Sequence, residues 1–585
     1  MRRTTERECC ILKKEIKELY DLWCEKTRDD RSLHEELLKI SGNDEEISDR
    51  FYRSLEFGTA GLRGVLGAGT NRMNVYTVNQ ATQGLADFLN SEYDSPGVAI
   101  AYDSRINSEL FAKEAAGVLA ANGVKVYIYP ELVPTPMLSF AVRKLSCSSG
   151  IIITASHNPA KYNGYKCYSP EGYQMTDEEA AKTYECISRV DMFDGVRRMD
   201  FDKGLESGLI EYIDSSVNEE FYSRVLSRRV NPDAPKKSGI KLIYTPLNGT
   251  GNKPVREVLS RAGFDDVTVV PSQENPDGNF PTCPYPNPEI RQAFEEALNL
   301  AQGTDADLLL ATDPDCDRVG IAVKDGGDYK LMSGNEVGVL LTEYVLSSMK
   351  AAGTLPDRPV ITKSFVTTPL VARVAADYGC EVADLLTGFK YIGEYITNLE
   401  KNGEENRFIL GMEESYGYLS GTHARDKDAV VASLLICEMA AHYKAQGKTL
   451  ADVMNSLYEK YGFYINSLLN FTFEGESGME KMTSIMAQLR GNAPASVAGM
   501  EVLAVSDYKK SETLDTKSGA VSKINLPKSN VLAYSLPGGN SVIVRPSGTE
   551  PKLKIYVTAC AAAAGEARKL SERIGADMET ILGVK

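Results

Sequence analysis

The chain contains little histidine and tryptophan, and it lacks the patterns that mark several common protein classes. Its 585 residues include 4 His and 1 Trp. No Gly-x-Ser-x-Gly segment occurs, and histidine is scarce as a general base, so a serine hydrolase built on that elbow is disfavoured. No Cys-x-x-Cys pair occurs among the 11 cysteines, which favours reduced thiols in a cytosol.

Long apolar runs and an excess of positive charge are also absent. Nowhere do 18 apolar residues follow one another, and the first residues contain no apolar signal segment. With 65 Lys and Arg against 81 Asp and Glu, the net charge is −16, which argues against a nucleic acid or an anionic membrane as partner. We therefore expect a cytoplasmic protein that acts on small molecules, with no indication of its oligomeric state.

Nucleotide-binding signatures are incomplete. The segment 447–449 reads Gly-Lys-Thr like the end of a P-loop, but His442 occupies the position of its first glycine. The pair Gly67 and Gly69 lacks both the third glycine and the preceding strand of a dinucleotide fingerprint. Neither ATP nor NAD is indicated.

Strand and helix patterns alternate through most of the chain. Residues 8–55 have the spacing of helices, with Trp23 on their apolar face. Apolar runs with strand character then alternate with helical stretches, at 98–102, 124–129, 240–244, 307–311, 360–362 and 408–410. This βαβ series predicts three similarly built α/β domains with largely parallel sheets.

The composition changes after a long helical stretch expected at 427–461. Alternating strands are expected at 466–473, 530–545 and 553–558, and a helix from about 559 that includes the alanine-rich run 559–564. This predicts a separate C-terminal α+β domain after a hinge near 462–466. The expected domain limits are 1–210, 211–327, 328–463 and 464–585.

Ser156 lies in the segment 154–159, Thr-Ala-Ser-His-Asn-Pro, directly after an apolar strand. A turn alone could use these residues, but open α/β sheets keep their chemistry at such strand ends. A serine that carries a phosphoryl group needs donors and a metal ion, and His157, Asn163 and Lys166 supply donors nearby in the sequence.

Asp313, Asp315 and Asp317 also follow an apolar strand, at alternate positions. Three such carboxylates can converge on one hard cation, and we expect Mg²⁺. An EF-hand would need Gly and Glu where Arg318 and Lys324 stand, and a haloacid-dehalogenase-type site would need Thr or Val in place of Asp317.

Three further segments suit phosphate or sugar. The glycine-rich segment 57–64 carries Arg63, a weak pattern by itself. In 413–417, taken as an extended loop, Glu413 and Ser415 would point the same way, toward adjacent sugar hydroxyls. The charged residues 425–428 would ordinarily be interpreted as the solvated start of a helix. Phosphate binding is suggested by a cluster of amides, hydroxyls and cations at Arg545, Ser547, Gly548, Thr549, Lys552 and Lys554.

In this order, the segments resemble the α-D-phosphohexomutase superfamily of phosphoglucomutases and phosphomannomutases. The resemblance extends from about residue 50 to the end, and the motifs at 58–63 and 413–417 are similar to the phosphoglucomutase-2-like branch. It implies an α/β protein of four domains around a central cleft: three similar mixed-sheet domains and a C-terminal phosphate-binding domain.

The resemblance also implies roles for individual residues. Ser156 would be the phosphoserine, with Asp313, Asp315 and Asp317 holding one Mg²⁺ beside it. Arg63 and Arg318 would flank the phosphoryl group, and His157 or Lys166 would be the base. The sugar would contact Thr387, Gly388, Glu413, Ser415 and Lys427, and the second phosphate would contact Arg545, Ser547, Gly548, Thr549 and Lys554. Lys554 stands where relatives often have Arg, so a point charge replaces a bidentate fork.

The expected activity is that of an α-phosphoglucomutase, with glucose 1,6-bisphosphate as intermediate and activator. Phosphomannomutase and phosphopentomutase use the same machinery and stay open, because residues 413–417 do not reveal hydroxyl stereochemistry. A sugar-phosphate phosphatase would release free phosphate. A silent binder would lack the serine or the aspartates, and all of these are present.

Overall fold

A computed structural model describes residues 13–58, 61–473, 476–547 and 552–584. Helices expected at the start of the chain are confirmed within this part as α1 (Lys14–Lys26), α2 (Arg31–Lys39) and α3 (Asp44–Phe51). Trp23 is fully buried and makes edge contacts with Phe51, Tyr76 and Phe193, which fixes the three helices to the first domain.

The first domain is a mixed six-stranded sheet with the strand order β1-β5-β4-β2-β3-β6. Its strands are β1 (Gly61–Val65), β2 (Gly97–Tyr102), β3 (Lys125–Ile128), β4 (Ser149–Ile153), β5 (Tyr162–Tyr168) and β6 (Ile210–Tyr212). Its helices are α4 (Val75–Glu92), α5 (Ser108–Ala121), α6 (Thr135–Lys144), α7 (Asp177–Ser188) and α8 (Phe201–Glu206). Strands β4, β2, β3 and β6 run parallel, as the βαβ pattern predicts, and β5 and β1 add an antiparallel edge.

The second sheet has the order β11-β10-β9-β7-β8 and is also mixed. It contains β7 (Leu242–Thr245), β8 (Val267–Val269), β9 (Leu308–Thr312), β10 (Val319–Asp325) and β11 (Asp328–Met332). The accompanying helices are α9 (Ser215–Leu226), α10 (Ala234–Ser238), α11 (Asn252–Ala262), α12 (Pro271–Glu274), η1 (Arg291–Phe294) and α13 (Glu295–Ala301).

The third sheet, β13-β12-β14-β15, comprises β12 (Val360–Ser364), β13 (Glu381–Leu385), β14 (Phe408–Glu413) and β15 (Gly417–Ser420). Its helices are α14 (Gly334–Ala352), α15 (Leu370–Ala376), α16 (Phe389–Lys401), η2 (Glu405–Arg407), α17 (Ala429–Lys444) and α18 (Leu450–Tyr461). The single helical stretch expected at 427–461 is wrong. It is divided at 445–449, where Gly447 has a φ of +73° and Thr449 caps α18.

The C-terminal domain is an antiparallel seven-stranded sheet with the order β16-β24-β23-β22-β19-β20-β21. Its strands are β16 (Phe463–Thr472), β19 (Ala504–Asp507), β20 (Glu512–Asp515), β21 (Val521–Lys523), β22 (Leu532–Ser535), β23 (Ser541–Pro546) and β24 (Lys552–Ala561). Beside it lie α19 (Glu476–Gly491), η3 (Pro537–Gly539), α20 (Ala564–Leu582) and a small pair, β17 (Ser496–Val497) and β18 (Met500–Glu501).

The alanine-rich run 559–564 is not a helix throughout, contrary to the expectation. Ala559 is buried opposite Ile465, and β24 continues to Ala561 before α20 begins at Ala564. Ladder hydrogen bonds to β16 and burial therefore override the helix propensity of alanine.

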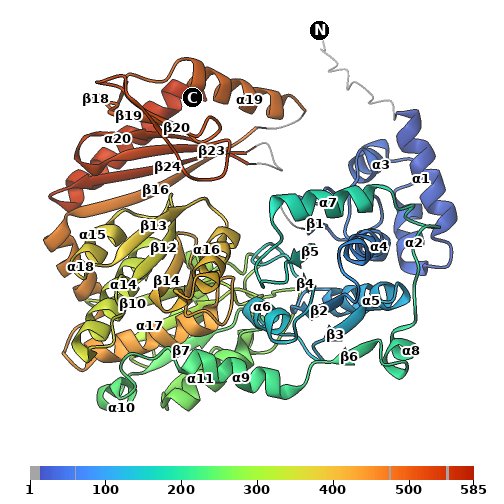
Figure 1. Cartoon of the computed structure of the whole chain (residues 1–585), viewed down its shortest axis with the longest axis horizontal. Coiled ribbons are helices and arrows are strands. Elements are labelled where there is room, and N and C mark those ends of the chain that lie inside the picture. Colours follow the sequence, from blue (N-terminus) through green and yellow to red (C-terminus); the bar gives the residue numbers. More distant parts are fainter. Residues whose placement is uncertain (1–12, 59–60, 474–475, 548–551, 585) are drawn as a thin grey trace, which may run out of the picture.

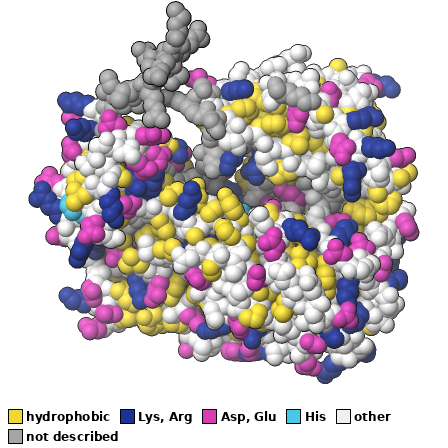
Figure 2. All heavy atoms as spheres, turned by 180° about the vertical axis from the view of Figure 1, so that it is seen from behind, with side chains coloured by type: hydrophobic (Ala, Val, Ile, Leu, Met, Phe, Trp, Pro, Cys, Tyr) yellow, Lys and Arg dark blue, Asp and Glu magenta, His cyan; other side chains and the backbone are white. Residues whose placement is uncertain are grey.

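Hydrophobic packing joins the first three domains more extensively than the fourth. One buried cluster includes residues of all three α/β sheets and their helices. The C-terminal domain has its own core, and a small apolar cluster of Val366, Val531, Ile543 and Tyr556 joins it to the third domain. Figure 1 shows the four sheets arranged around the middle of the molecule, and the opposite view shows a hollow with acidic and basic side chains at its edges (Figure 2).

Candidate active site

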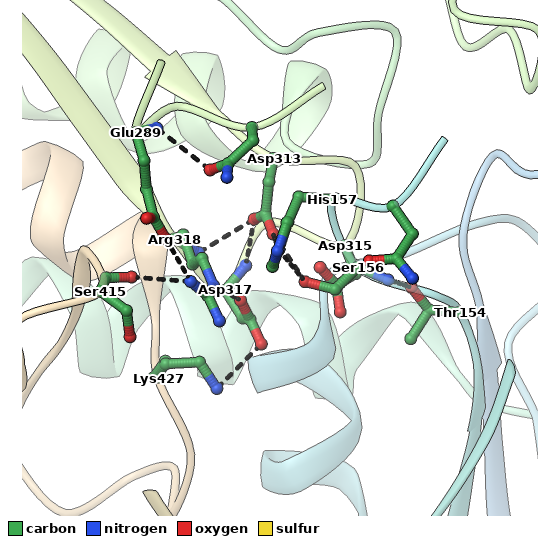
Figure 3. Close-up of polar contacts among 12 residues, drawn as sticks. Thr154, Ser156, His157, Glu289, Asp313, Asp315, Asp317, Arg318, Ser415 and Lys427 are labelled. Carbon is green, nitrogen blue, oxygen red and sulfur yellow. Dashed lines mark hydrogen bonds and ion pairs between the residues drawn. The ribbon is translucent and has the colours of Figure 1, made fainter. Parts of the chain in front are cut away.

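Ser156 lies just beyond the carboxyl end of the parallel strand β4, in a strained backbone conformation. Its φ is +52°, in the left-handed region that residues other than glycine seldom adopt. Its hydroxyl donates to Asp313 Oδ2 at 2.9 Å, and its N–H donates to Thr154 Oγ1 at 2.8 Å (Figure 3). The serine is thus held with its hydroxyl directed at the second domain.

Arg105 fixes the loop that carries this serine. Its fully buried guanidinium donates to the carbonyls of Ser156 at 2.5 Å, Pro159 at 3.0 Å and Tyr162 at 3.1 Å, and also to that of Asn158. Asp103 pairs with Arg105 Nε at 3.3 Å. Neither residue was predicted to have a role, although both lie in the loop just after the strand expected at 98–102.

The three aspartates after β9 form one buried cluster. One carboxylate oxygen from each of Asp313, Asp315 and Asp317 lies within 4.8 Å of the other two. Cys316, between them, has a φ of +51°, which folds the loop back on itself. In the part of the chain that the structure describes, Asp315 Oδ1 and Asp317 Oδ1 are buried without a hydrogen-bond partner. Oxygen ligands with free lone pairs in this arrangement suit a hard divalent cation.

The charges of the cluster are unevenly compensated by protein groups. Burial, and then the neighbouring Asp315 and Asp317, raise the pKa of Asp313 well above its usual range. Burial alone would raise the pKa of Asp315, but Lys166, with Nζ at 3.0 Å from Asp315 Oδ2, acts together with a hydrogen bond from Asp313 and the charge of Lys427, so the pKa of Asp315 is lowered. A cation bound by the three carboxylates would remove the repulsion that raises the pKa of Asp313.

Arg318 connects the aspartate loop to the third domain. Its guanidinium donates to Glu289 Oε1 at 2.5 Å and to the carbonyl of Ser415 at 3.0 Å. Its backbone N–H donates to Asp313 Oδ1 at 3.0 Å (Figure 3). Glu289 was not singled out from the sequence, since it lies in a proline-rich loop far from the aspartates along the chain.

Both candidate bases lie beside the cluster. His157 Nδ1 is 3.1 Å from Ser156 Oγ, and Lys166 is engaged with Asp315. Burial, and then the positive charges of Arg318 and Arg63, lower the pKa of His157 well below its usual value. His157 is therefore uncharged at pH 7. Arg63 lies on β1, which pairs with the Lys166 strand β5.

The segment expected to bind sugar has a different local shape from the one predicted. Residues 414–416 form a turn between β14 and β15, with Tyr416 at a φ of +65°, so the extended loop expected at 413–417 is wrong. Glu413 accepts from the N–H of Gly388 at 2.7 Å, which brings Thr387 and Gly388 beside it. Glu414 instead accepts from Ser364 Oγ at 2.8 Å, on β12.

The charges at 425–428 do precede a helix, since Asp428 caps α17, but they are buried, so the expectation that they are solvated is wrong. Lys427 Nζ lies 2.9 Å from Asp317 Oδ2 and 3.0 Å from Asp426 Oδ1, and it lies over the ring of Phe389. Tyr168 donates to Asp426 Oδ2 at 2.7 Å. A cation of the third domain thereby contacts the aspartate cluster of the second.

In the C-terminal domain, Arg545 on β23 lies opposite Lys554 on β24 in the strand register. Burial, and then the charge of Arg545, lower the pKa of Lys554. The N–H of Ser547 donates to the carbonyl of Lys552 at 2.7 Å. This hydrogen bond links the end of β23 to the start of β24. Gly548 and Thr549, also predicted to bind phosphate, lie outside the described residues.

Four family models match the chain in order. They are described as Phosphoglucomutase/phosphomannomutase, alpha/beta/alpha domain I at residues 54–193, domain II at 219–327, domain III at 333–461, and the C-terminal domain at 498–574. Among curated proteins, the phosphoglucomutase of Staphylococcus saprophyticus is 37% identical over 539 residues, covering 92% of this chain and 95% of that protein. The phosphoglucomutase of Staphylococcus aureus strain USA300 is 36% identical over 542 residues, with the same coverage.

Solved structures share the fold at lower identity. A phosphoglucomutase/phosphomannomutase family protein from Burkholderia thailandensis has a TM-score of 0.63 and 20% identity, covering 90% of this chain and 97% of that one. The parafusin of Paramecium, titled a phosphoglucomutase, has a TM-score of 0.66 and 17% identity, covering 91% and 97%.

Proposed function

The chain belongs to the phosphoglucomutase/phosphomannomutase family, and on this basis we propose that it is an α-phosphoglucomutase that interconverts glucose 1-phosphate and glucose 6-phosphate. One observation carries the proposal. A serine hydroxyl lies 2.9 Å from a buried cluster of three aspartates in which two carboxylate oxygens have no hydrogen-bond partner among the described residues. Phosphoryl transfer through a serine requires this combination of a nucleophile and concentrated opposite charge.

The residues present fit one Mg²⁺. Asp313, Asp315 and Asp317 would hold it, with Ser156 completing the set, and their donor oxygens suit a hard cation. When bound, Mg²⁺ supplies charge stabilisation to the phosphoryl group in transit. The described residues include no helix long and apolar enough to cross a membrane. A cytoplasmic location stays a prediction.

In the proposed cycle, Ser156 carries the phosphoryl group between substrates. The phosphorylated serine transfers this group to the free hydroxyl of a sugar monophosphate, which gives glucose 1,6-bisphosphate and the free serine. The bisphosphate then reverses its orientation in the site and returns its other phosphoryl group to Ser156. The phosphorylated enzyme is thereby restored, and substrate and product contain the same atoms. Added glucose 1,6-bisphosphate acts as activator because it rephosphorylates a serine that has lost its group to water.

Neutral His157, with Nδ1 at 3.1 Å from Ser156 Oγ, is placed to move the serine proton, and Lys166 is the alternative. Arg63 and Arg318 would neutralise the phosphoryl oxygens. Thr387, Gly388, Glu413, Ser415 and Lys427 would contact the sugar. The phosphate that is not transferred would be held by Arg545, Ser547, Gly548, Thr549 and Lys554.

The choice of sugar is tested by comparing kcat/KM for the 1-phosphates of glucose, mannose and ribose with Mg²⁺ and the bisphosphate present. We expect glucose to be favoured by more than about tenfold, which is ~1.4 kcal/mol of transition-state discrimination. A preference for ribose would instead make the chain a phosphopentomutase, and a preference for mannose a phosphomannomutase. Release of free phosphate as the main product would replace the mutase by a phosphatase.

A further inference from the structure

A pocket rich in positive charge lies where the first three domains meet, outside the candidate active site. It has a volume of ≈ 310 Å³ and lies among α6, the end of α9 and the loop after β15. Helices α6 and α9 contact each other and lie together in the lower middle of Figure 1. Of the lining side chains, four are cationic and one is a carboxylate: Arg143, Lys144, Arg224 and Arg228, against Glu400.

The ion pairs around this pocket leave an excess of positive charge. Glu400 is shared between Arg143, at 2.9 Å, and the fully buried Arg425, at 2.6 Å. Glu220 is likewise shared between Lys144, at 2.5 Å, and Arg224, at 3.2 Å. Each carboxylate therefore pairs with two cations. The charge around the pocket is positive, although the chain as a whole has a net charge of −16.

Arg228 has no carboxylate partner in the described part of the chain. Its Nε and Nη2 lie 3.2 Å from Ser227 Oγ, and its side chain lies across Gly421. Gly421 has a φ of +83°, and a Cβ there would meet Arg228 Cδ at 2.5 Å. The glycine therefore makes room for the arginine beside the pocket.

We infer that this pocket binds the phosphate group of a small phosphorylated molecule, at a site separate from the candidate active site. Arginine guanidinium groups are the preferred partners of phosphate because they donate two parallel hydrogen bonds. The volume lies at the lower end of the range for small-molecule sites. Nothing in the proposed catalytic cycle uses these residues.

The pocket is connected to the aspartate cluster by α6. Thr135, in the first turn of this helix, donates to Asp315 Oδ2 at 3.1 Å, while Arg143 and Lys144 lie in its last turn, about 15 Å along a ten-residue helix. Arg143 also donates to the carbonyl of Thr422 at 2.8 Å, in the loop that continues to Lys427. A ligand in the pocket would thus contact two segments that reach the candidate active site.

The test is calorimetric titration of the purified full chain with inorganic pyrophosphate, in EDTA and at constant ionic strength. We expect two classes of pyrophosphate-binding sites, one in this pocket and one in the candidate active site. Arg228→Gln should weaken one class at least tenfold and leave the other unchanged, whereas Arg568→Gln, the same change at an exposed position on α20, should affect neither. A single class in the unmodified chain, or identical titrations of the unmodified chain and Arg228→Gln, would overturn the inference.

Two further variants keep the result interpretable. Lys144→Gln, on the opposite side of the pocket, should weaken the same class as Arg228→Gln, and thermal unfolding without pyrophosphate shows whether either variant is folded. Lys554→Gln, in the proposed active site, should weaken only the other class. If Lys554→Gln and Arg228→Gln weakened the same class, the pocket would not be a separate site.

Discussion

At the scale of single residues, the candidate site pairs buried carboxylates with buried lysine side chains. Lys166 neutralises Asp315 and Lys427 neutralises Asp317, whereas Asp313 faces the serine hydroxyl. Each cation comes from a different domain than the aspartate it contacts. The site is therefore complete only when the first three domains are packed together.

Asp317→Asn removes one proposed metal ligand while it keeps the size of the side chain. Since changes one shell further out commonly cost 10- to 100-fold in metal affinity, we expect a loss of at least about 100-fold in the apparent affinity for Mg²⁺. The measurement is mutase rate against Mg²⁺ concentration after dialysis with a chelator. The control is Asp305→Asn, which changes an exposed carboxylate shortly before β9, the strand that leads to the aspartates. An unchanged Mg²⁺ dependence of Asp317→Asn would remove Asp317 from the metal site.

Lys554 provides a pH prediction. Its lowered pKa means that the folded protein loses this positive charge at a pH below the usual Lys value of about 10.4. If Lys554 holds phosphate, KM should rise as the pH increases through that lowered pKa. Lys554→Arg, which stays charged, should keep KM flat over the same pH range. Parallel KM profiles for the two proteins would contradict the assigned role.

Several residues of the site could not be predicted from the sequence. Ser156 and the three aspartates stand in short, recognisable segments, and the structure brings them together. Arg105, Glu289 and Asp426 have no such signal, because their roles come from contacts with carbonyls, with Arg318 and with Lys427 that only the tertiary fold creates. The burial of the charges around Arg425 could not be predicted either, because a run of charged residues is usually solvated and one sequence does not show otherwise.

At the scale of elements, the strained serine loop depends on one buried ion pair. Arg105→Gln would leave Asp103 buried without its partner and would release four carbonyls, so we expect a loss of about 3–5 kcal/mol in the free energy of unfolding. Urea denaturation measures this, and kcat should fall because the serine is no longer held. The double variant Asp103→Asn/Arg105→Gln should recover part of the stability. Equal stability of the single and double variants would show that the pair does not support the loop.

Element types were predicted better than element ends. The strands before Ser156, Asp313 and Glu413 all form, because apolar runs of this length are buried in each sheet. The break at 445–449 and the strand character of 559–561 were missed, since a local glycine and a neighbouring strand decided them. The domain limits at 210/211, 327/328 and 463/464 stay predictions.

At the scale of the whole molecule, the C-terminal domain is joined to the third domain by Tyr464, which belongs to the large buried cluster, and by the small apolar cluster that contains Val366 and Ile543. Val366 of this cluster directly precedes Thr367, whose hydroxyl accepts from the N–H of Glu414 at 3.0 Å, next to Glu413. The position of the C-terminal domain is therefore linked to the segment proposed to bind sugar. We propose that this contact keeps water away from the phosphoserine during turnover.

Ile543→Ala removes part of this contact from the C-terminal side. We expect a loss near the lower end of the 2–5 kcal/mol typical of such truncations, since Ile543 is 8% exposed. The ratio of phosphate release to mutase turnover should rise several-fold. Ile581→Ala, at a partly buried position packed against the core of the same domain, is the control. An unchanged ratio in Ile543→Ala would argue against a role in water exclusion.

The central claim is that Ser156 carries the phosphoryl group. The direct measurement is to label the protein with ³²P-glucose 1,6-bisphosphate, locate the label by peptide mapping, and chase it with unlabelled glucose 1-phosphate. The account predicts that the label is on Ser156 and leaves as sugar phosphate at least as fast as kcat, and that Ser156→Ala is unlabelled and inactive. Label on another residue, label that is not chased, or full mutase activity of Ser156→Ala would contradict it.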